Sequence, residues 1–363
     1  DEPCPGGEPA YGWDGAPGWA TLDGGASRCL YDGTRELSPA VMAAFMSFWD
    51  DDEGPGGVGI RTRYARMLGY LARRLAPHDA VAGYDLMNEP NALFSALQQF
   101  EAMSQLYADA LAEIRVAEAS VGAPPRLVFF EPSILWNDFG VGAPPPFAND
   151  GQIVYAPHIY HGGINSLPLT REVFEGVRSE AAAYGGTPVL TGEWGAEPRR
   201  ASDPEDDYFA RHQALQDEFR FGATLWTYRE ACGDPHKASD FRWGREAYVW
   251  GLYDVDCATN QELGLREDLV RALTRPYVRA APGRITSMVS DPGSGVLTAT
   301  GADASRGSVL VAFFPGGGGR PSIRARGLAG RWVIAAPGGH HYVVARARGG
   351  AWSLEIRPHR RGH

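Results

Sequence analysis

Residues 83–90 read GYDLMNEP, a short apolar run that leads into Asn88, Glu89 and Pro90. A second run at residues 188–195 reads PVLTGEWG and carries Glu193. Each glutamate stands where an apolar segment gives way to a stretch rich in Gly, Pro or Asn, which is typical of a barrel strand that ends at a loop. Two carboxylates at the ends of separate parallel strands can face each other across one pocket, and we expect this pair to do so.

Strand-like segments alternate with helical ones around these two runs. The predicted helices cover residues 39–50, 58–76, 95–119, 171–184, 206–220 and 266–273. The predicted strands cover residues 81–87, 126–130, 153–160, 188–191 and 222–228. This alternation predicts an α/β protein with a parallel sheet, and residues suited to catalysis at the strand ends favour a (β/α)8 TIM barrel. Five strands are three short of a complete barrel.

The pattern changes after residue 278 to short alternating β-type segments separated by turns. These segments cover residues 285–289, 296–300, 308–314, 322–325, 331–335, 341–345 and 352–357. They predict a small C-terminal antiparallel β-sandwich. We therefore expect a catalytic barrel domain at residues 1–278 and a β-sandwich domain at residues 279–363.

The composition indicates a large folded protein that does not bind nucleic acid. The 363 residues are 44% hydrophobic, and the net charge of −10 argues against a polyanionic partner. Arginines are concentrated in the C-terminal part, where we favour a solvated basic face over transient contact with a membrane surface. No apolar run reaches the length of a transmembrane helix.

The four cysteines form two local pairs, Cys4 with Cys29 and Cys232 with Cys257. Their spacing does not suggest a metal site. We favour two loop-stapling disulfides in a secreted bacterial protein, and four free thiols in a cytosolic enzyme remain the alternative.

A pair of strand-end carboxylates is the minimal equipment for breaking a glycosidic bond. A retaining enzyme needs a carboxylic acid that protonates the leaving oxygen and a carboxylate that attacks the anomeric carbon, about 5–5.5 Å apart. Asn88, directly before Glu89, can donate a hydrogen bond to a sugar hydroxyl. We expect no metal and no organic cofactor.

Other residues in these segments have less specific interpretations. Glu131 also ends a predicted strand, and we interpret it as a structural or supporting group. Trp194 directly follows Glu193, and core packing suits it as well as ligand contact does. Two loops with several aromatic residues are candidate walls of a binding cleft or simple covers of the barrel rim. One contains Leu135, Trp136, Phe139 and Phe147, and the other, at residues 230–260, contains Trp243, Tyr248 and Trp250.

The order and flanks of these motifs resemble the retaining glycoside hydrolases of family 5 (clan A). The resemblance implies that Glu89 is the acid/base after strand four and that Glu193 is the nucleophile ending strand seven. It implies that Tyr160 orients the nucleophile and that Trp226 forms the floor of the sugar subsite next to the cleavage point. The predicted substrate-binding residues are Asn88, His158, Tyr160, Trp194 and Trp226.

A closer resemblance is to the endoglycosylceramidases. It rests on GAPGWA at residues 15–20, GYDLMNEP at residues 83–90 and RPY at residues 275–277. These enzymes cut the bond between a glycan and ceramide, so we expect a retaining endo-glycosidase acting on glycosphingolipids. The alternatives are a family 5 β-glucanase or mannanase for soluble polysaccharides, and a non-catalytic protein that binds glycans or lipids.

The chain also departs from the family pattern. Family members carry an arginine on strand two and a histidine at the end of strand three, and neither has a match here. The resemblance thus implies that the chain starts after strand three. We expect a separate N-terminal polypeptide to complete the barrel, with the alternative that the chain is one piece of a longer protein.

Overall fold

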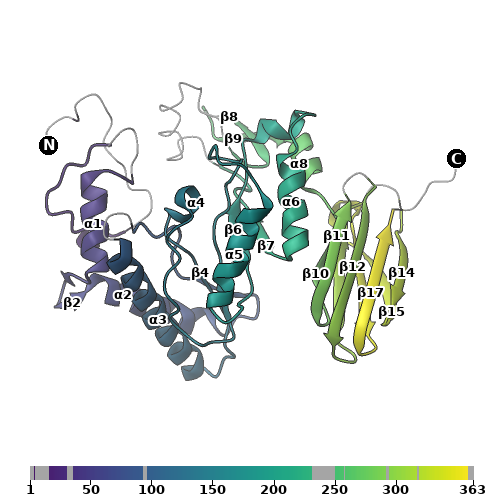
Figure 1. The fold of residues 1–363 in the computed structure, drawn as a ribbon, viewed down its shortest axis with the longest axis horizontal. Coiled ribbons are helices and arrows are strands. Elements are labelled where there is room, and N and C mark those ends of the chain that lie inside the picture. The colour runs from purple at the N-terminus through teal and green to yellow at the C-terminus, as the bar shows by residue number, and fades with distance from the viewer. Residues whose placement is uncertain are drawn as a thin grey trace.

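The computed structural model describes residues 4, 16–30, 36–92, 96–230, 250–256, 258–291, 294–316 and 319–358. Figure 1 shows the helices and the parallel strands on one side of the chain and the C-terminal antiparallel strands on the other. Four residues named in the sequence predictions lie outside the described residues: Cys232, Trp243, Tyr248 and Cys257.

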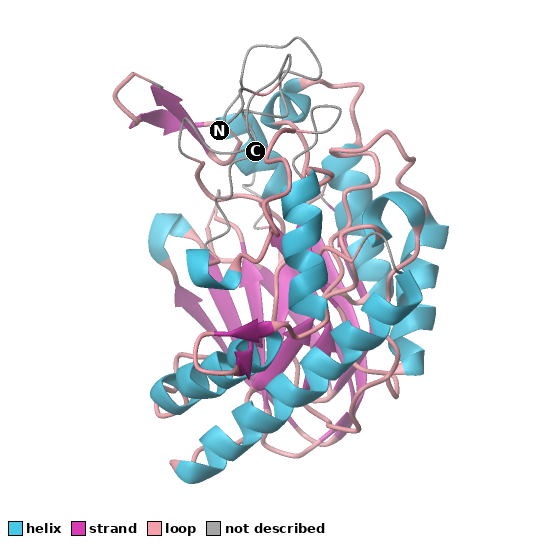
Figure 2. Cartoon of the chain, turned by 90° about the vertical axis from the view of Figure 1, so that its left-hand side faces the viewer, coloured by secondary structure: helices cyan, strands magenta, loops and turns pink. Residues whose placement is uncertain are grey.

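Five parallel strands form the sheet that carries both glutamates. They are β3 (Gly83–Asp85), β4 (Leu127–Phe130), β5 (Ile153–Tyr155), β6 (Leu190–Trp194) and β7 (Gly222–Leu225). Neighbouring strands pair in chain order, with a bridge from Tyr155 to Val189 that joins β5 to the segment before β6. Figure 2 shows these strands with helices beside them. This is the strand order of a TIM-barrel-like fold.

Helices connect and cover the strands. They are α1 (Pro39–Trp49), α2 (Ile60–Leu75), α3 (Ala96–Ser120), α4 (Trp136–Phe139), α5 (Arg171–Ala183), α6 (Tyr208–Phe219) and α8 (Glu267–Leu273). Helix α2 is amphipathic because Ile60, Leu68 and Ala72 share a buried face. Within the described residues, no helix is both long enough and apolar enough to span a bilayer.

Alternation along each strand decides which side chains enter the core between sheet and helices. On β4, Val128 and Phe130 are fully buried, whereas Leu127 and Phe129 are half-buried on the other face. Phe130 packs against Tyr107 of α3 and against Phe147 and Tyr184. Burial of a side chain of this size contributes about 1.5–3 kcal/mol. The core therefore fixes the strand ends, and with them the glutamates.

The C-terminal part contains two four-stranded antiparallel sheets. One has the order β10 (Tyr277–Ala280), β13 (Val309–Phe314), β16 (His341–Ala347), β15 (Leu328–Ala335); the other has the order β11 (Arg284–Asp291), β12 (Val296–Ala304), β17 (Gly350–Arg357), β14 (Ser322–Arg326). Leu297, Leu310, Val343 and Ile356 form the centre of a core to which both sheets contribute. Strand β10 was not predicted, and it spans the expected domain boundary at residues 278/279.

Two short antiparallel hairpins were also not predicted. They pair β1 (Glu53–Gly54) with β2 (Val58–Gly59) and β8 (Tyr253–Asp256) with β9 (Gln261–Leu265). Three 3-10 turns complete the described elements, at η1 (Gly18–Ala20), η2 (Pro198–Ser202) and η4 (Pro337–Gly339).

The buried side chain of Asp217 joins the two parts of the chain. Asp217 on α6 pairs with Arg275, which lies between α8 and β10. The other carboxylate oxygen of Asp217 accepts a hydrogen bond of 3.0 Å from the backbone N–H of Ser290 on β11. One side chain thus connects α6 to the first strand of a C-terminal sheet.

One of the two expected disulfides falls on described residues. Cys4 and Cys29 are bonded, which ties the N-terminal segment to residue 29. The pair Cys232 and Cys257 lies outside the described residues.

Candidate active site

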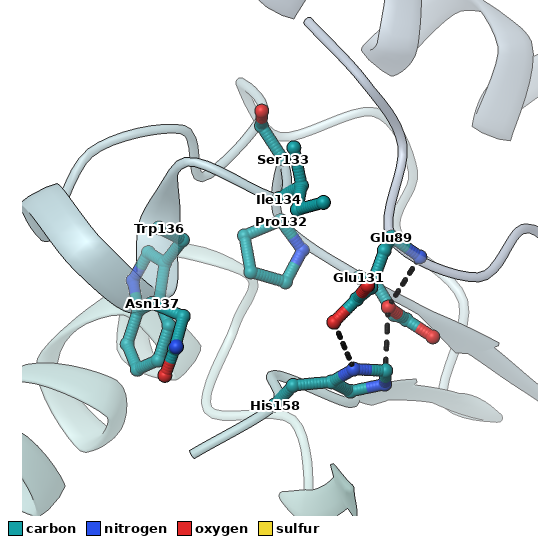
Figure 3. A pocket seen from close by; sticks show the side chains of 8 residues that line it. All are labelled: Glu89, Glu131, Pro132, Ser133, Ile134, Trp136, Asn137 and His158. Atoms are coloured by element: carbon teal, nitrogen blue, oxygen red, sulfur yellow. Dashed lines mark hydrogen bonds and ion pairs between the residues drawn. The ribbon is translucent and has the colours of Figure 1, made fainter. Parts of the chain in front are cut away.

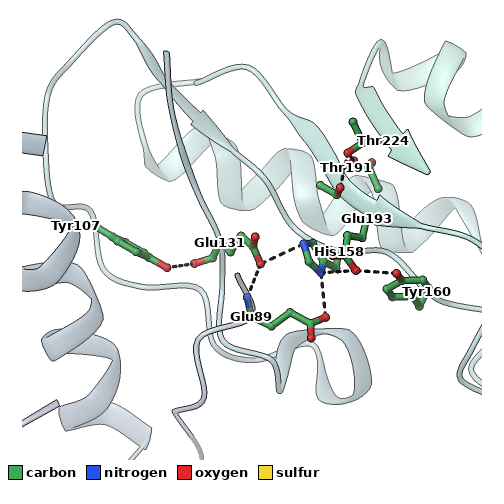
Figure 4. Close-up of polar contacts among 9 residues, drawn as sticks. Glu89, Tyr107, Glu131, His158, Tyr160, Thr191, Glu193 and Thr224 are labelled. Atoms are coloured by element: carbon green, nitrogen blue, oxygen red, sulfur yellow. Dashed lines mark hydrogen bonds and ion pairs between the residues drawn. The ribbon is translucent and has the colours of Figure 1, made fainter. Parts of the chain in front are cut away.

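Glu89 lies in the loop after β3 and has an uncommon backbone conformation. Its φ of 40° falls in the left-handed region, which residues other than glycine rarely adopt. The Glu89 N–H donates a hydrogen bond of 2.9 Å to Oε2 of Glu131, which directly follows β4. This bond helps to hold the loop so that the Glu89 carboxylate lies beside His158 (Figure 4).

Glu193 lies on β6 and points to the same cluster. Its Oε2 accepts a hydrogen bond of 2.7 Å from the hydroxyl of Tyr160. A carboxylate oxygen of Glu89, one of Glu193 and a ring nitrogen of His158 all lie within 4.8 Å of one another. The two nearest carboxylate oxygens are thus closer to the separation of about 5–5.5 Å between the carboxyl groups of a retaining glycosidase than to the about 6.5–9.5 Å of an inverting enzyme.

His158 is buried between three carboxylates. Its Nδ1 lies 2.9 Å from Oε1 of Glu89 and 3.4 Å from Oε2 of Glu193, and its Nε2 lies 3.2 Å from Oε2 of Glu131. Burial lowers the pKa of His158, but the hydrogen bonds to Glu131 and Glu89 outweigh burial and raise that pKa to about 11. His158 is therefore an imidazolium with an N–H on each ring nitrogen.

The grouping of Glu89, His158 and Glu193 is compact enough for a metal ion, but its chemistry favours an ion-paired cluster. A histidine that binds a metal must be neutral. His158 is instead held in its protonated form by carboxylates on both ring nitrogens.

Glu131 and Tyr160 are the two most enclosed partners. Burial raises the pKa of Glu131, and the hydrogen bond to His158 opposes that rise. Burial and the charge of Glu193 raise the pKa of Tyr160, so its hydroxyl stays protonated and donates to Glu193. The backbone carbonyl of Glu131 accepts a further hydrogen bond of 2.8 Å from Tyr107.

A small pocket opens beside this cluster (Figure 3). Its lining residues come mainly from the strand ends and from the segment that leads into α4: Glu89, Glu131, Pro132, Ser133, Ile134, Trp136, Asn137 and His158. Asn137 accepts a hydrogen bond of 2.9 Å from the backbone N–H of Tyr160. No motif in the sequence singles out Asn137, because its hydrogen bond to Tyr160 joins two loops that are distant along the chain.

The remaining predicted substrate residues differ in their placement. Asn88 is exposed next to Glu89, and Trp226 is half-buried directly after β7. Trp194 lies in the core, where it stacks on His212 and contacts Tyr208. This placement corrects the expectation that Trp194 contacts substrate, because it points to α6 while its neighbour Glu193 points to His158 and Tyr160.

The aromatic residues of the two candidate wall loops also differ in exposure. Phe139 is 70% exposed at the end of α4, whereas Phe147 packs into the core against Tyr107 and Phe130. Trp136 is buried and lines the pocket. Trp250 is buried, and its backbone N–H donates to Glu230.

Comparisons with known proteins identify the family and the fold. The family model described as Cellulase (glycosyl hydrolase family 5) matches residues 49–231. The crystal structure of an endogalactoceramidase is 34% identical, with 94% of this chain and 71% of that chain covered and a TM-score of 0.77. Endo-glycoceramidase II from Rhodococcus sp. is 22% identical, with 97% and 78% covered and a TM-score of 0.68.

A more distant structure shares the fold alone. Sterylglucosidase 1 from Cryptococcus neoformans is 12% identical, with 89% of this chain and 71% of that chain covered and a TM-score of 0.56. Among curated protein sequences, none matches the chain.

Proposed function

Because the chain belongs to glycosyl hydrolase family 5 and is a glycoside hydrolase of the endoglycoceramidase type, we propose that it is a retaining endo-glycosidase that releases glycans from ceramide. The observation that carries the retaining assignment is the placement of Glu89 and Glu193, whose carboxylate oxygens lie within 4.8 Å of each other. The similarity to an endogalactoceramidase supports ceramide as the leaving group.

In the first step, Glu89 is the general acid and Glu193 is the nucleophile. Glu193 attacks the anomeric carbon while Glu89 gives its proton to the glycosidic oxygen, so the C–O bond to ceramide breaks and ceramide leaves as an alcohol. Tyr160 donates to Oε2 of Glu193 and keeps that carboxylate oriented. The remaining product is a glycan joined to Glu193 through an ester.

In the second step, Glu89 is the general base. It takes a proton from a water molecule, and the water oxygen attacks the same anomeric carbon and displaces Glu193. The two displacements restore the original configuration at that carbon. Asn88 directly precedes Glu89, and Trp226 directly follows β7, the strand that pairs with the one carrying Glu193. We propose that both residues bind the sugar at the cleavage point.

The lipid specificity has its own test. The purified protein is incubated with glycosphingolipids whose glycans are joined to ceramide through galactose or through glucose, and the products are separated by mass. We expect intact glycan and free ceramide, with the galactose-linked substrate preferred because the 34% identical structure is an endogalactoceramidase. Release of single sugars, or no cleavage of either lipid, would contradict the proposal.

The second candidate is a family 5 enzyme for soluble polysaccharides, and the description of the matching family model as Cellulase favours it. Such an enzyme would shorten carboxymethylcellulose or mannan and leave glycolipids intact. Parallel assays on these polymers therefore separate the two substrate classes.

We also infer that three further strands complete the barrel and that the C-terminal sheets form a β-sandwich domain at residues 279–363. Among the described strands, β3 pairs only with β4 and β7 pairs only with β6, which leaves an open edge on each side of the sheet. The intact mass of the natural protein, and assays with and without a candidate N-terminal polypeptide, would test the completion. Full activity of this chain alone would contradict it.

The remaining proposals concern location. We propose a secreted enzyme of bacterial origin; the disulfide between Cys4 and Cys29 supports secretion, because such bonds persist in oxidising compartments. We keep transient contact with a membrane surface as a proposal, since the lipid substrate would be presented there.

A further inference from the structure

A buried carboxylate stands behind the catalytic pair, and the reaction described above does not use it. Glu131 is 2% exposed and directly follows β4. Its Oε2 contacts two groups at once, the backbone N–H of Glu89 at 2.9 Å and Nε2 of His158 at 3.2 Å. Figure 4 shows this carboxylate on the opposite side of His158 from the carboxylates of Glu89 and Glu193.

The first contact concerns the backbone. Glu89 has a φ of 40°, which is strained for a residue with a side chain. A hydrogen bond from its N–H to a charged carboxylate is stronger than one to a neutral acceptor. The bond from Glu89 to Glu131 therefore stabilises the backbone conformation that directs the Glu89 side chain to the pocket.

The second contact concerns charge. A buried imidazolium needs an anionic partner, and the Nδ1–H side of His158 faces the catalytic carboxylates. Glu131 supplies a fixed partner on the Nε2 side. The titratable groups around His158 are Glu89 and Asp85 near β3, Glu131 after β4, Glu193 on β6 and Tyr160 in its own loop.

We propose that Glu131 is a positioning residue, which holds the backbone of Glu89 and keeps His158 a cation whose Nδ1–H lies between the two catalytic carboxylates. In the first step Glu89 carries the proton that it gives away, so the Nδ1–H of the cation faces one ionised carboxylate, that of Glu193. When Glu193 becomes an ester, it loses its negative charge. The Nδ1–H of His158 then donates a hydrogen bond only to the carboxylate of Glu89. Glu89 is the general base of the second step, and this hydrogen bond keeps its carboxylate in place. This inference rests on the proposed roles of Glu89 and Glu193.

The substitution Glu131→Gln removes the charge and keeps the size. The chain offers a closely matched control in Glu118, which is also 2% exposed. Glu118 likewise pairs with a basic side chain, Arg115 at 2.7 Å, and accepts a backbone N–H, that of Arg126 at 2.9 Å. It lies at the opposite end of β4, so Glu118→Gln reproduces the loss of a buried charge away from the pocket.

The readout is the titration of the His158 ring by NMR, with its signal assigned through its loss in His158→Asn. In the unchanged protein, His158 should not titrate between about pH 5 and pH 9, whereas an ordinary histidine has a pKa of about 6.5. In Glu131→Gln it should titrate inside this range, because the anionic partner on Nε2 is gone. In Glu118→Gln it should behave as in the unchanged protein.

Activity on a soluble aryl glycoside gives the second readout. Glu131→Gln should lower kcat by roughly a hundredfold, the lower end of what general acid–base catalysis contributes. It should also add an alkaline loss of activity, since His158 then loses its proton as the pH rises. Glu118→Gln should lower stability without changing the shape of the pH profile.

Three results would overturn the proposal: a wild-type His158 that titrates near its ordinary pKa, a Glu131→Gln protein with an unchanged pH profile, or equal effects of the two substitutions. The first result does not depend on Glu131→Gln, so it decides the question even where that variant does not fold. Failure to cleave any glycolipid would contradict the proposed function and leave the His158 titration as an independent result.

Discussion

Strand β6 has a buried histidine on each side, and the two histidines differ in charge. On the pocket side, carboxylates surround His158 and raise its pKa to about 11. On the helix side, His212 of α6 stacks on Trp194 at 4.4 Å, and burial lowers its pKa to about 3 despite a hydrogen bond to the carbonyl of Ile159. Burial is common to both, so the charge of the neighbours decides which histidine is a cation.

Adjacent residues of β6 likewise face its two different sides. Glu193 faces Glu89 and His158, and Trp194 faces the core. We therefore expect substitutions on the pocket side to remove activity and to leave the fold intact. Substitutions on the helix side should lower stability first.

The largest expected effect is that of Glu193→Gln on the pocket side. The amide cannot form the ester intermediate, so kcat should fall by roughly 10⁴-fold or more. Glycan release measures the loss, and calorimetry with an uncleaved glycolipid should show that binding is retained. Turnover near the wild-type rate would refute the nucleophile assignment.

The next effect is that of Glu89→Gln, which should depend on the leaving group. Cleavage of a ceramide glycoside should fall by roughly 10²- to 10⁴-fold, because the departing alkoxide needs a proton. An aryl glycoside with an acidic phenol needs little protonation, so the formation of the glycosyl-enzyme should be much less affected. Equal losses on both substrates would argue against Glu89 as the acid.

On the helix side, Trp194→Ala should lower the free energy of unfolding by about 3–5 kcal/mol, as truncation of a buried tryptophan does. Denaturant unfolding followed by fluorescence or circular dichroism measures this loss. Trp194→Phe is the matched control and should cost less, since it keeps a ring against His212. If Trp194→Ala instead lost most of its activity and kept its stability, the proposal that this side of β6 serves stability and not catalysis would be wrong.

The smallest effect is the pH dependence that His212 imposes on stability. Its pKa is lowered in the folded state, so the unfolded state binds the proton first as the pH falls below about 6.5. The contribution is fully present above that pH and is lost as the pH falls toward 3. Between pH 7 and pH 5 the free energy of unfolding should decrease by about 2 kcal/mol from this residue.

The variant His212→Gln provides the comparison for this pH effect, because its amide can still donate to Ile159. Denaturant unfolding at several pH values should give a shallower decrease for this variant than for the unchanged protein. Identical slopes would show that His212 does not titrate between the two states as described.

The sequence was sufficient for the elements that carry the catalytic pair. Apolar runs that end in Asn-Glu-Pro or Gly-Glu-Trp mark strand ends, and the order of Glu89, His158, Tyr160 and Glu193 matches a family pattern. The side that Trp194 faces could also have been predicted, since adjacent residues of a strand point to opposite faces and Glu193 had already been placed toward the pocket.

Contacts between segments that are distant along the chain could not be predicted from the sequence. The apolar run that ends at Phe130 placed Glu131 at a strand end. Its contacts with His158 and with the Glu89 backbone depend on the packing of three strands. Strand β10 was missed for a similar reason, because Tyr277–Ala280 is short and becomes a strand by pairing with β13.

The ion pair of Asp217 has a consequence for protein engineering. Its partners Arg275 and Ser290 lie on opposite sides of the expected domain boundary. If the chain were cut at that boundary, the N-terminal part would keep the buried carboxylate of Asp217 but lose the hydrogen bond that this carboxylate accepts from the backbone N–H of Ser290. Grafting the C-terminal sheets onto another enzyme would therefore require transferring this junction as a unit, with an acidic residue on the receiving helix.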